Sequence, residues 1–213
     1  MYTKEQLRRL LIPLMFEQVL TALMGSVDTI MVTNIGSAAI SAVSLVDSLN
    51  ILIINVFAAT ATGGAIICAQ YLGSNQKDKA NQILKQLIFS VTLISILITI
   101  PCILFRIPLL TLIFGSVEKS VMDNSLSYLY ITALSYPFIA LYNAAAASFR
   151  TSQNSILPMA IAFGSNILNI VGNIFFIFTL SLGVAGAAIS TLLSRIVSAL
   201  IILILLKQPK QDL

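Results

Sequence analysis

Long apolar runs alternate with short polar segments along the whole chain. About 20 consecutive apolar residues suffice for an α-helix to cross the hydrocarbon core of a bilayer. The predicted spans cover residues 10–35, 40–72, 83–105, 125–149, 156–180 and 183–206. The pattern therefore predicts an all-α membrane protein, a bundle of six transmembrane helices in which residues 1–213 form a single unit.

The segments between and within the runs predict where the helices end or bend. Residues 73–81 form the clearest polar loop, and residues 106–123 have the mixed character of an interfacial segment. Gly63 and Gly64 make a weak point in the long second run, and Pro137 predicts a kink in the fourth.

Composition supports lipid as the main partner of this chain. Hydrophobic residues make up 58% of the sequence and charged residues 9%, against about 25% charged residues in soluble domains. The first apolar run continues past Ile30 without a small-residue cleavage pattern, so we interpret it as a span and not as a removed signal.

The sequence offers little of the chemistry that enzymes use. It has no histidine, and its two cysteines, Cys68 and Cys102, lie inside apolar runs. Without histidine the usual general base near neutral pH is missing, and two isolated thiols make a poor metal site. We therefore expect neither an enzyme nor a resident cofactor or metal.

The basic residues predict the orientation of the chain. The net charge is +4, but Lys and Arg lie between apolar runs, which favours a role in topology over nucleic-acid binding. Two basic residues, Arg106 and Lys119, fall on one predicted side. Nine fall on the other: Lys4, Arg8, Arg9, Lys77, Lys79, Lys85, Arg150, Lys207 and Lys210. The positive-inside rule then predicts a multi-pass plasma-membrane protein with both termini and the 73–82 loop in the cytoplasm.

Several polar residues are predicted to lie at one depth in the outer half of the membrane. At 1.5 Å per residue, Asp28, Asp47 and Asn173 each lie about 10 Å from the outer end of their spans. Asn169 is one helical turn deeper, and Thr191 lies about 12 Å from the outer end of the last span. A charge in hydrocarbon costs at least about 2.5–3.5 kcal/mol, so acids that persist there are usually paired, hydrated or functional.

One carboxylate among amide and hydroxyl oxygens is a plausible site for H⁺ or Na⁺. A buried carboxyl group can load and release a proton, and an ionised one can hold a hard cation. The alternative interpretation is that Asn169, Asn173 and Thr191 are hydrogen-bonding contacts between helices.

Three further charged residues inside the spans keep two interpretations each. Glu17, next to Gln18, could face a cytoplasmic vestibule or pair with a base. Asp47 could act with Asp28 or reach the outer interface. Arg195 shares a helix face with Thr191 and could neutralise a carboxylate or pack within the bundle.

Motifs spread over nearly the whole chain resemble the multidrug and toxic compound extrusion (MATE) family. Each motif alone is weak, but their order and spacing together are specific. The matching positions are Pro13, Glu17, Gln18, Asp28 within Val-Asp-Thr-Ile-Met-Val, Gly36, Gln70, Gly73, Arg150, Pro158, Asn166, Asn169, Asn173 and the Gly-Val-Ala-Gly-Ala-Ala segment from Gly183 to Ala188.

The resemblance implies that this chain corresponds to the N-terminal six-helix lobe of a twelve-helix transporter. Such proteins export small, often cationic molecules in exchange for H⁺ or Na⁺, and they belong to a superfamily that includes lipid-linked saccharide flippases. Asp28, Asn169, Asn173 and Thr191 match the family's ion or proton site, with Glu17, Asp47, Gln70 and Arg195 as accessory candidates. Members with an acid at the second position of the fifth span have two carboxylates there, whereas this chain has Asn173.

Several functions remain open from the sequence. The chain is either a fragment whose second lobe lies elsewhere or a half-transporter that pairs with a second copy, and we favour the fragment because nothing in it looks specialised for self-pairing. A saccharide flippase needs a wide cationic cavity, yet only Arg195 lies within a span. A non-transporting membrane assembly subunit is the alternative from a different class.

Overall fold

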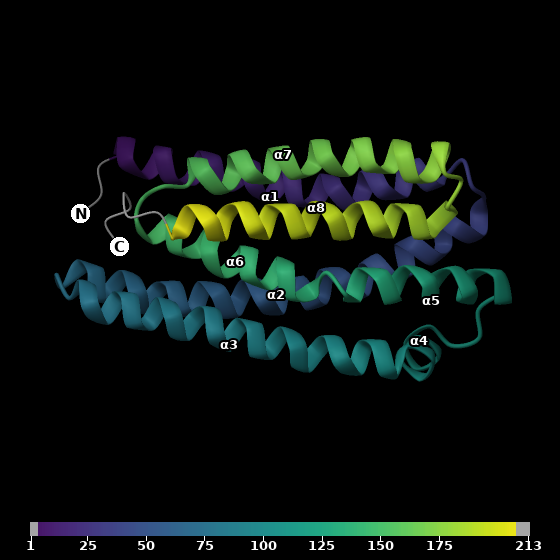
Figure 1. Cartoon of the computed structure of the whole chain (residues 1–213), viewed down its shortest axis with the longest axis horizontal. Coiled ribbons are helices and arrows are strands. Elements are labelled where there is room, and N and C mark those ends of the chain that lie inside the picture. Colours follow the sequence, from purple (N-terminus) through teal and green to yellow (C-terminus); the bar gives the residue numbers. More distant parts are fainter. Residues whose placement is uncertain (1–3, 208–213) are drawn as a thin grey trace.

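The computed structural model describes residues 4–207, and this part of the chain folds into helices without strands (Figure 1). Of the residues behind the predicted orientation, Lys210 and the side chains of Lys4 and Arg9 lie outside the described part. The elements are α1 (Lys4–Val32), α2 (Ser37–Gly73), α3 (Lys77–Leu104), α4 (Arg106–Phe114), α5 (Lys119–Ala133), α6 (Tyr136–Thr151), α7 (Ile156–Asn173), the π-helix η1 (Ile174–Thr179) and α8 (Gly183–Leu206).

Six membrane spans emerge when a bent pair of helices is counted as one. Five stretches are long and apolar enough by themselves: Leu10–Val32, Ser37–Gly73, Lys77–Leu104, Ile156–Thr179 and Gly183–Leu206. Together, α5 and α6 pass the same test, with a bend of 45° between them. The all-α, six-span class predicted from the sequence is thereby confirmed.

The bent span has the kink predicted from Pro137 and differs from its prediction only in detail. Its helical part begins at Lys119, earlier than the predicted position 125, and its break lies between Ala133 and Tyr136. Pro137, the predicted kink, occupies the first turn of α6, where a missing backbone N–H costs nothing. The helix α2, in contrast, continues through Gly63 and Gly64 without interruption.

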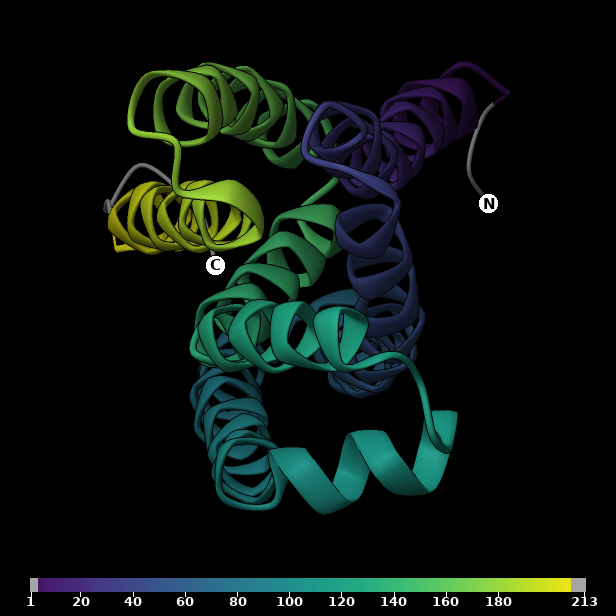
Figure 2. The ribbon, with the colours of Figure 1, turned by 90° about the vertical axis from the view of Figure 1, so that its right-hand side faces the viewer.

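The long helices run roughly parallel or antiparallel and form two groups that meet along α5 and α6 (Figure 1). In one group α7 packs between α1 and α8, and in the other α2 packs against α3. The helix α6 contacts α2, α3 and α8. Viewed along the long helices, α4 lies across their direction, as suits the predicted interfacial segment (Figure 2). The start of α1 and the end of α8 lie at the same end of the bundle (Figure 1).

Small residues inside the bundle let the helices approach closely. Ala144, Ala145 and Ala146 on α6 and Ala187 on α8 are all fully buried. Large apolar side chains point outward instead, and Leu112 is 85% exposed. This inversion of a soluble protein's surface is what lipid as the surrounding solvent requires.

Gly186 is the tightest backbone contact between α8 and η1. A Cβ atom there would lie 2.9 Å from the carbonyl carbon and oxygen of Phe176, which are backbone atoms and cannot rotate away. Gly164 on α7 has no atom within 4 Å of such a Cβ. The two glycines therefore form a matched pair for testing this packing.

We expect Gly186→Ala to destabilise the protein by about 1–3 kcal/mol, because overpacking forces a backbone shift. Gly164→Ala should be neutral or slightly stabilising, since alanine favours helix. Thermal unfolding of the purified protein in detergent measures both, with about 2–4 °C lost per kcal/mol. Equal melting temperatures for the two variants would contradict the close contact at Gly186.

Candidate functional site

A cavity of about 440 Å³ lies among α1, α2, α5, α6, α7 and α8. Side chains from all six helices line it, so it belongs to no single element. Its polar wall includes Asp28, Asp47, Tyr128, Thr191 and Arg195. Asp28, Asp47 and Thr191, which were predicted at a similar membrane depth, thus share one cavity, whereas Asn169 and Asn173 are not part of its lining.

The carboxylate of Asp28, on α1, accepts hydrogen bonds from side chains on two other helices. The side chain is 1% exposed. Asn173 Nδ2 donates to Asp28 Oδ1 at 2.6 Å, and Thr191 Oγ1 donates to Asp28 Oδ2 at 2.6 Å. Both partners are neutral, so the hydrogen bonds stabilise the carboxylate without balancing its charge.

Asn169 completes this cluster on the side away from the cavity. Its Nδ2 donates to Thr191 Oγ1 at 3.1 Å, and Ser190 Oγ donates to its backbone carbonyl at 2.6 Å. Gly172 makes room for this contact, since a Cβ there would collide with Ser190 Oγ. The predicted role of these residues as contacts between helices is therefore real, and it coexists with a buried acid.

One acceptor in the cluster is left over. Asn173 is fully buried, and its Oδ1 has no hydrogen-bond partner among the described residues. A buried polar atom without a partner costs about 1–3 kcal/mol, so this amide oxygen is available to a cation or a hydrogen-bond donor. Carboxylate, amide and hydroxyl oxygens are also the ligands that hard cations prefer.

Asp47, on α2, lines the same cavity as Asp28. Its Oδ1 accepts from Asn50 Nδ2 at 3.1 Å and from the Tyr128 hydroxyl at 3.2 Å. Tyr136 in turn donates to Asn50 Oδ1 at 2.7 Å. Asp47 thus lines the cavity and is held there by side chains of α2 and α5.

Sequence reasoning missed most of the residues that hold Asp47. Asn50 could have been found, because a residue three positions further along a helix lies on the same face. Tyr128 and Tyr136 could not, because the link depends on how α2 packs against α5 and α6.

Arg195 reaches the break in the bent span. Its Nη1 donates to Ser135 Oγ at 2.7 Å, and Ser135 Oγ donates to the carbonyl of Thr132 at 2.5 Å. Among the described residues Arg195 forms no ion pair with a carboxylate, although it lines the cavity together with Asp28 and Asp47. The guanidinium therefore acts on both acids through space.

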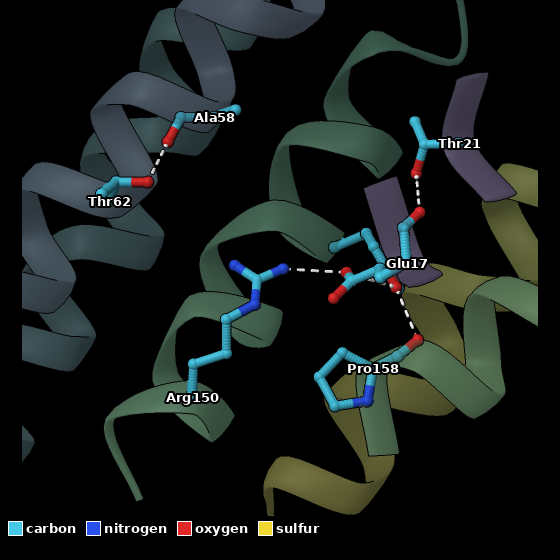
Figure 3. A network of polar contacts seen from close by, with 7 residues as sticks. Glu17, Thr21, Ala58, Thr62, Arg150 and Pro158 are labelled. Carbon is cyan, nitrogen blue, oxygen red and sulfur yellow. Dashed lines mark hydrogen bonds and ion pairs between the residues drawn. The ribbon is translucent and has the colours of Figure 1, made fainter. Parts of the chain in front are cut away.

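Glu17, near the middle of α1, forms a separate network (Figure 3). It is 2% exposed, and its Oε1 accepts from Arg150 Nη2 at 2.8 Å. The Tyr142 hydroxyl lies 3.1 Å from the same oxygen and 2.9 Å from the carbonyl of Pro158. Of the two interpretations of Glu17, pairing with a base is the one that the structure supports. Gln70 is exposed on α2 and does not line the cavity.

Comparisons with known proteins agree with this architecture. The MatE family model matches residues 13–175. The "Uncharacterized transporter YisQ" of Bacillus subtilis is 30% identical over 92% of this chain, which covers 44% of that protein.

Two solved structures superpose closely on this fold. One is an outward-facing multidrug resistance MATE family transporter of the MOP superfamily, with a TM-score of 0.89, 25% identity and coverage of 96% of this chain and 45% of that one. The other is a MOP superfamily transporter from Pyrococcus furiosus, described as having a binding pocket of reverse polarity, with a TM-score of 0.90, 26% identity and coverage of 98% of this chain and 46% of that one. The chain thus spans about half the length of the proteins it matches.

The Glu17–Arg150 pair should contribute to stability. We expect Glu17→Gln to cost about 3 kcal/mol, because it leaves the largely buried Arg150 guanidinium, 22% exposed, without its counter-charge. Adding Arg150→Gln should cost less than the sum of the two single changes. Melting temperatures of the four proteins measure this coupling, with Glu118→Gln at an exposed acid as the control. Additive losses would show that the two side chains do not interact.

Proposed function

The chain belongs to the MatE family, and we propose that it forms one lobe of an antiporter that exports small organic cations in exchange for H⁺ or Na⁺. The observation that carries this proposal is the Asp28 carboxylate, which is buried in a cavity wall and hydrogen-bonded only to neutral side chains. A membrane protein that buries an acid in this way needs a positive charge to balance it.

A proton is one way to balance Asp28. Rotation of the Asn173 side-chain amide by 180° would place its oxygen against Asp28 Oδ1. A protonated Asp28 would then donate to that oxygen, and the leftover acceptor would find a partner.

A sodium ion is the other way. Asp28 supplies a charged oxygen, Thr191 a hydroxyl oxygen, and Asn173 an amide oxygen without a partner. This set contains a single acid, so it suits a monovalent cation that must also be released. The cavity beside it, about 440 Å³ in volume, is in the range of small-molecule sites.

Exchange of substrate for ion follows because the ion site and the substrate cavity share one carboxylate, that of Asp28. An organic cation in the cavity and a coupling ion at Asp28 would compete for one negative charge. Each would therefore help to expel the other, and this reciprocity is a requirement for coupled transport.

The complete transporter would need a second lobe. The related structures are about twice as long as this chain, so the partner would be a second six-helix lobe, either a C-terminal half or a second copy. A flippase for a lipid-linked saccharide fits less well, because the cavity presents two acids and one base to an anionic pyrophosphate.

Asp28→Asn should abolish coupled export while leaving membrane insertion intact. Purified protein in proteoliposomes would be loaded with ethidium, and dye movement followed under an imposed pH or Na⁺ gradient. Asp123→Asn, at an exposed acid on α5, serves as the matched control and should transport normally. Gradient-driven export that survives Asp28→Asn would refute the coupling role of this residue.

Asn173→Asp should change the ion dependence of transport. A second carboxylate beside Asp28 strengthens Na⁺ binding by about tenfold in apparent affinity, since a nearby charge contributes on the order of 1–4 kcal/mol. Asn154→Asp, in the turn before α7, makes the same change of chemistry away from the cluster. Unchanged Na⁺ and pH dependence would leave Asn173 with only a packing role.

A further inference from the structure

The charges that line the cavity do not cancel. In the described part of the chain, the charged residues of the lining are Asp28, Asp47 and Arg195. With both acids ionised, their sum is one negative charge. When a coupling ion neutralises Asp28, the sum falls to zero.

Of the two carboxylate oxygens of Asp47, one accepts both hydrogen bonds of this side chain and the other accepts none from the described residues. Both hydrogen bonds to this carboxylate, from Asn50 and Tyr128, end on Oδ1. Its Oδ2 faces α1, where a Cβ on Gly25 would lie 3.7 Å from it. Gly25 is three residues before Asp28, so the free oxygen of Asp47 lies near the same face of α1 as the buried acid.

Arg195 is held where its charge affects both acids. The hydrogen bond to Ser135 fixes the guanidinium at the break between α5 and α6. Asp28, Asp47 and Arg195 line the same cavity, so each of the two acids lies within the field of the guanidinium and of the other acid. A fixed positive charge that has no carboxylate in direct contact lowers the attraction of the whole cavity for cations.

We propose that Arg195, balanced against Asp47, is a specificity determinant that restricts the cavity to substrates with a single positive charge. The inference rests on the proposed function and adds the charge of the substrate to it. Asp47 Oδ2 receives the cationic group of the substrate, and Arg195 makes a second cationic group unfavourable.

The physical reason is the low dielectric of a buried cavity. A monocation brings the total charge to zero with Asp28 ionised, whereas a dication leaves an uncompensated positive charge. Uncompensated charge in such surroundings is far more costly than in water. Loading Asp28 with H⁺ or Na⁺ would make even a monocation excess charge, so release of the substrate follows from the same balance.

Two related dyes test this charge limit. Ethidium and propidium share one ring system, but ethidium carries one positive charge and propidium two. Binding of each to the purified protein in lipid nanodiscs can be followed by dye fluorescence, without transport. We expect ethidium to bind about tenfold more tightly than propidium to the unaltered protein, as one unbalanced charge implies.

Removing the Arg195 charge should shift this preference. Arg195→Gln should change the ratio of the two affinities by about tenfold in favour of propidium, and Arg195→Lys should preserve the original ratio. Asp47→Asn should weaken ethidium binding by about tenfold. The combined variant with Asp47→Asn and Arg195→Gln restores a net charge of minus one and should recover the preference for ethidium, an outcome that a purely structural role would not produce.

The controls separate this inference from the proposed function. Arg106→Gln removes an arginine outside the cavity, on α4, and should leave the ratio unchanged. If the dyes bind but Arg195→Gln leaves their ratio unchanged, or the combined variant fails to restore it, the charge limit is wrong. If the unaltered protein binds neither dye, the cation cavity fails as well, whereas unimpaired coupling in Asp28→Asn counts against the proposed function alone.

Discussion

Polar groups inside a membrane are stable only when other parts of the protein satisfy them, and this constraint organises the bundle. Hydrocarbon offers no hydrogen bonds, so a buried carboxylate must obtain them from neighbouring helices. Asp28 on α1 obtains them from Asn173 on α7 and Thr191 on α8. The three helices that carry these residues form one side of the bundle (Figure 1).

The two fully buried acids of α1 meet the same constraint in opposite ways. Glu17 lies against an arginine, and the ion pair joins α1 to the end of α6 (Figure 3). Asp28 has only neutral hydrogen-bond donors and borders a cavity. A closed ion pair suits a structural link, whereas a carboxylate without its own counter-charge suits an ion that comes and goes.

Arg195 connects the charged cavity to the break in the bent span. Its hydrogen bond to Ser135 lies at the break in the bent span, where the backbone of a continuous helix is interrupted. One side chain therefore both supports an irregular backbone inside the membrane and contributes to the charge of the cavity. Such irregular segments are tolerated at membrane depth where protein surrounds them.

The sequence alone determined the features that depend on local pattern. The lengths of the apolar runs and the polar segments between them predicted six spans, and counting residues along each span predicted that Asp28, Asn169, Asn173 and Thr191 lie at a similar depth. Because an α-helix rises by a fixed distance per residue, the depth of a residue in the membrane can be counted from the sequence. The direction in which its side chain points relative to the other helices cannot.

Only the tertiary structure decided which groups meet. Glu17 pairs with Arg150, 133 residues away, and Asp47 accepts a hydrogen bond from Tyr128, 81 residues away. The π-helical end of the fifth span was equally absent from the pattern, whereas the break at Ser135 lies two residues before Pro137, where a kink was predicted. These features depend on how the helices rotate and pack against one another, and that packing is set by all of their faces together.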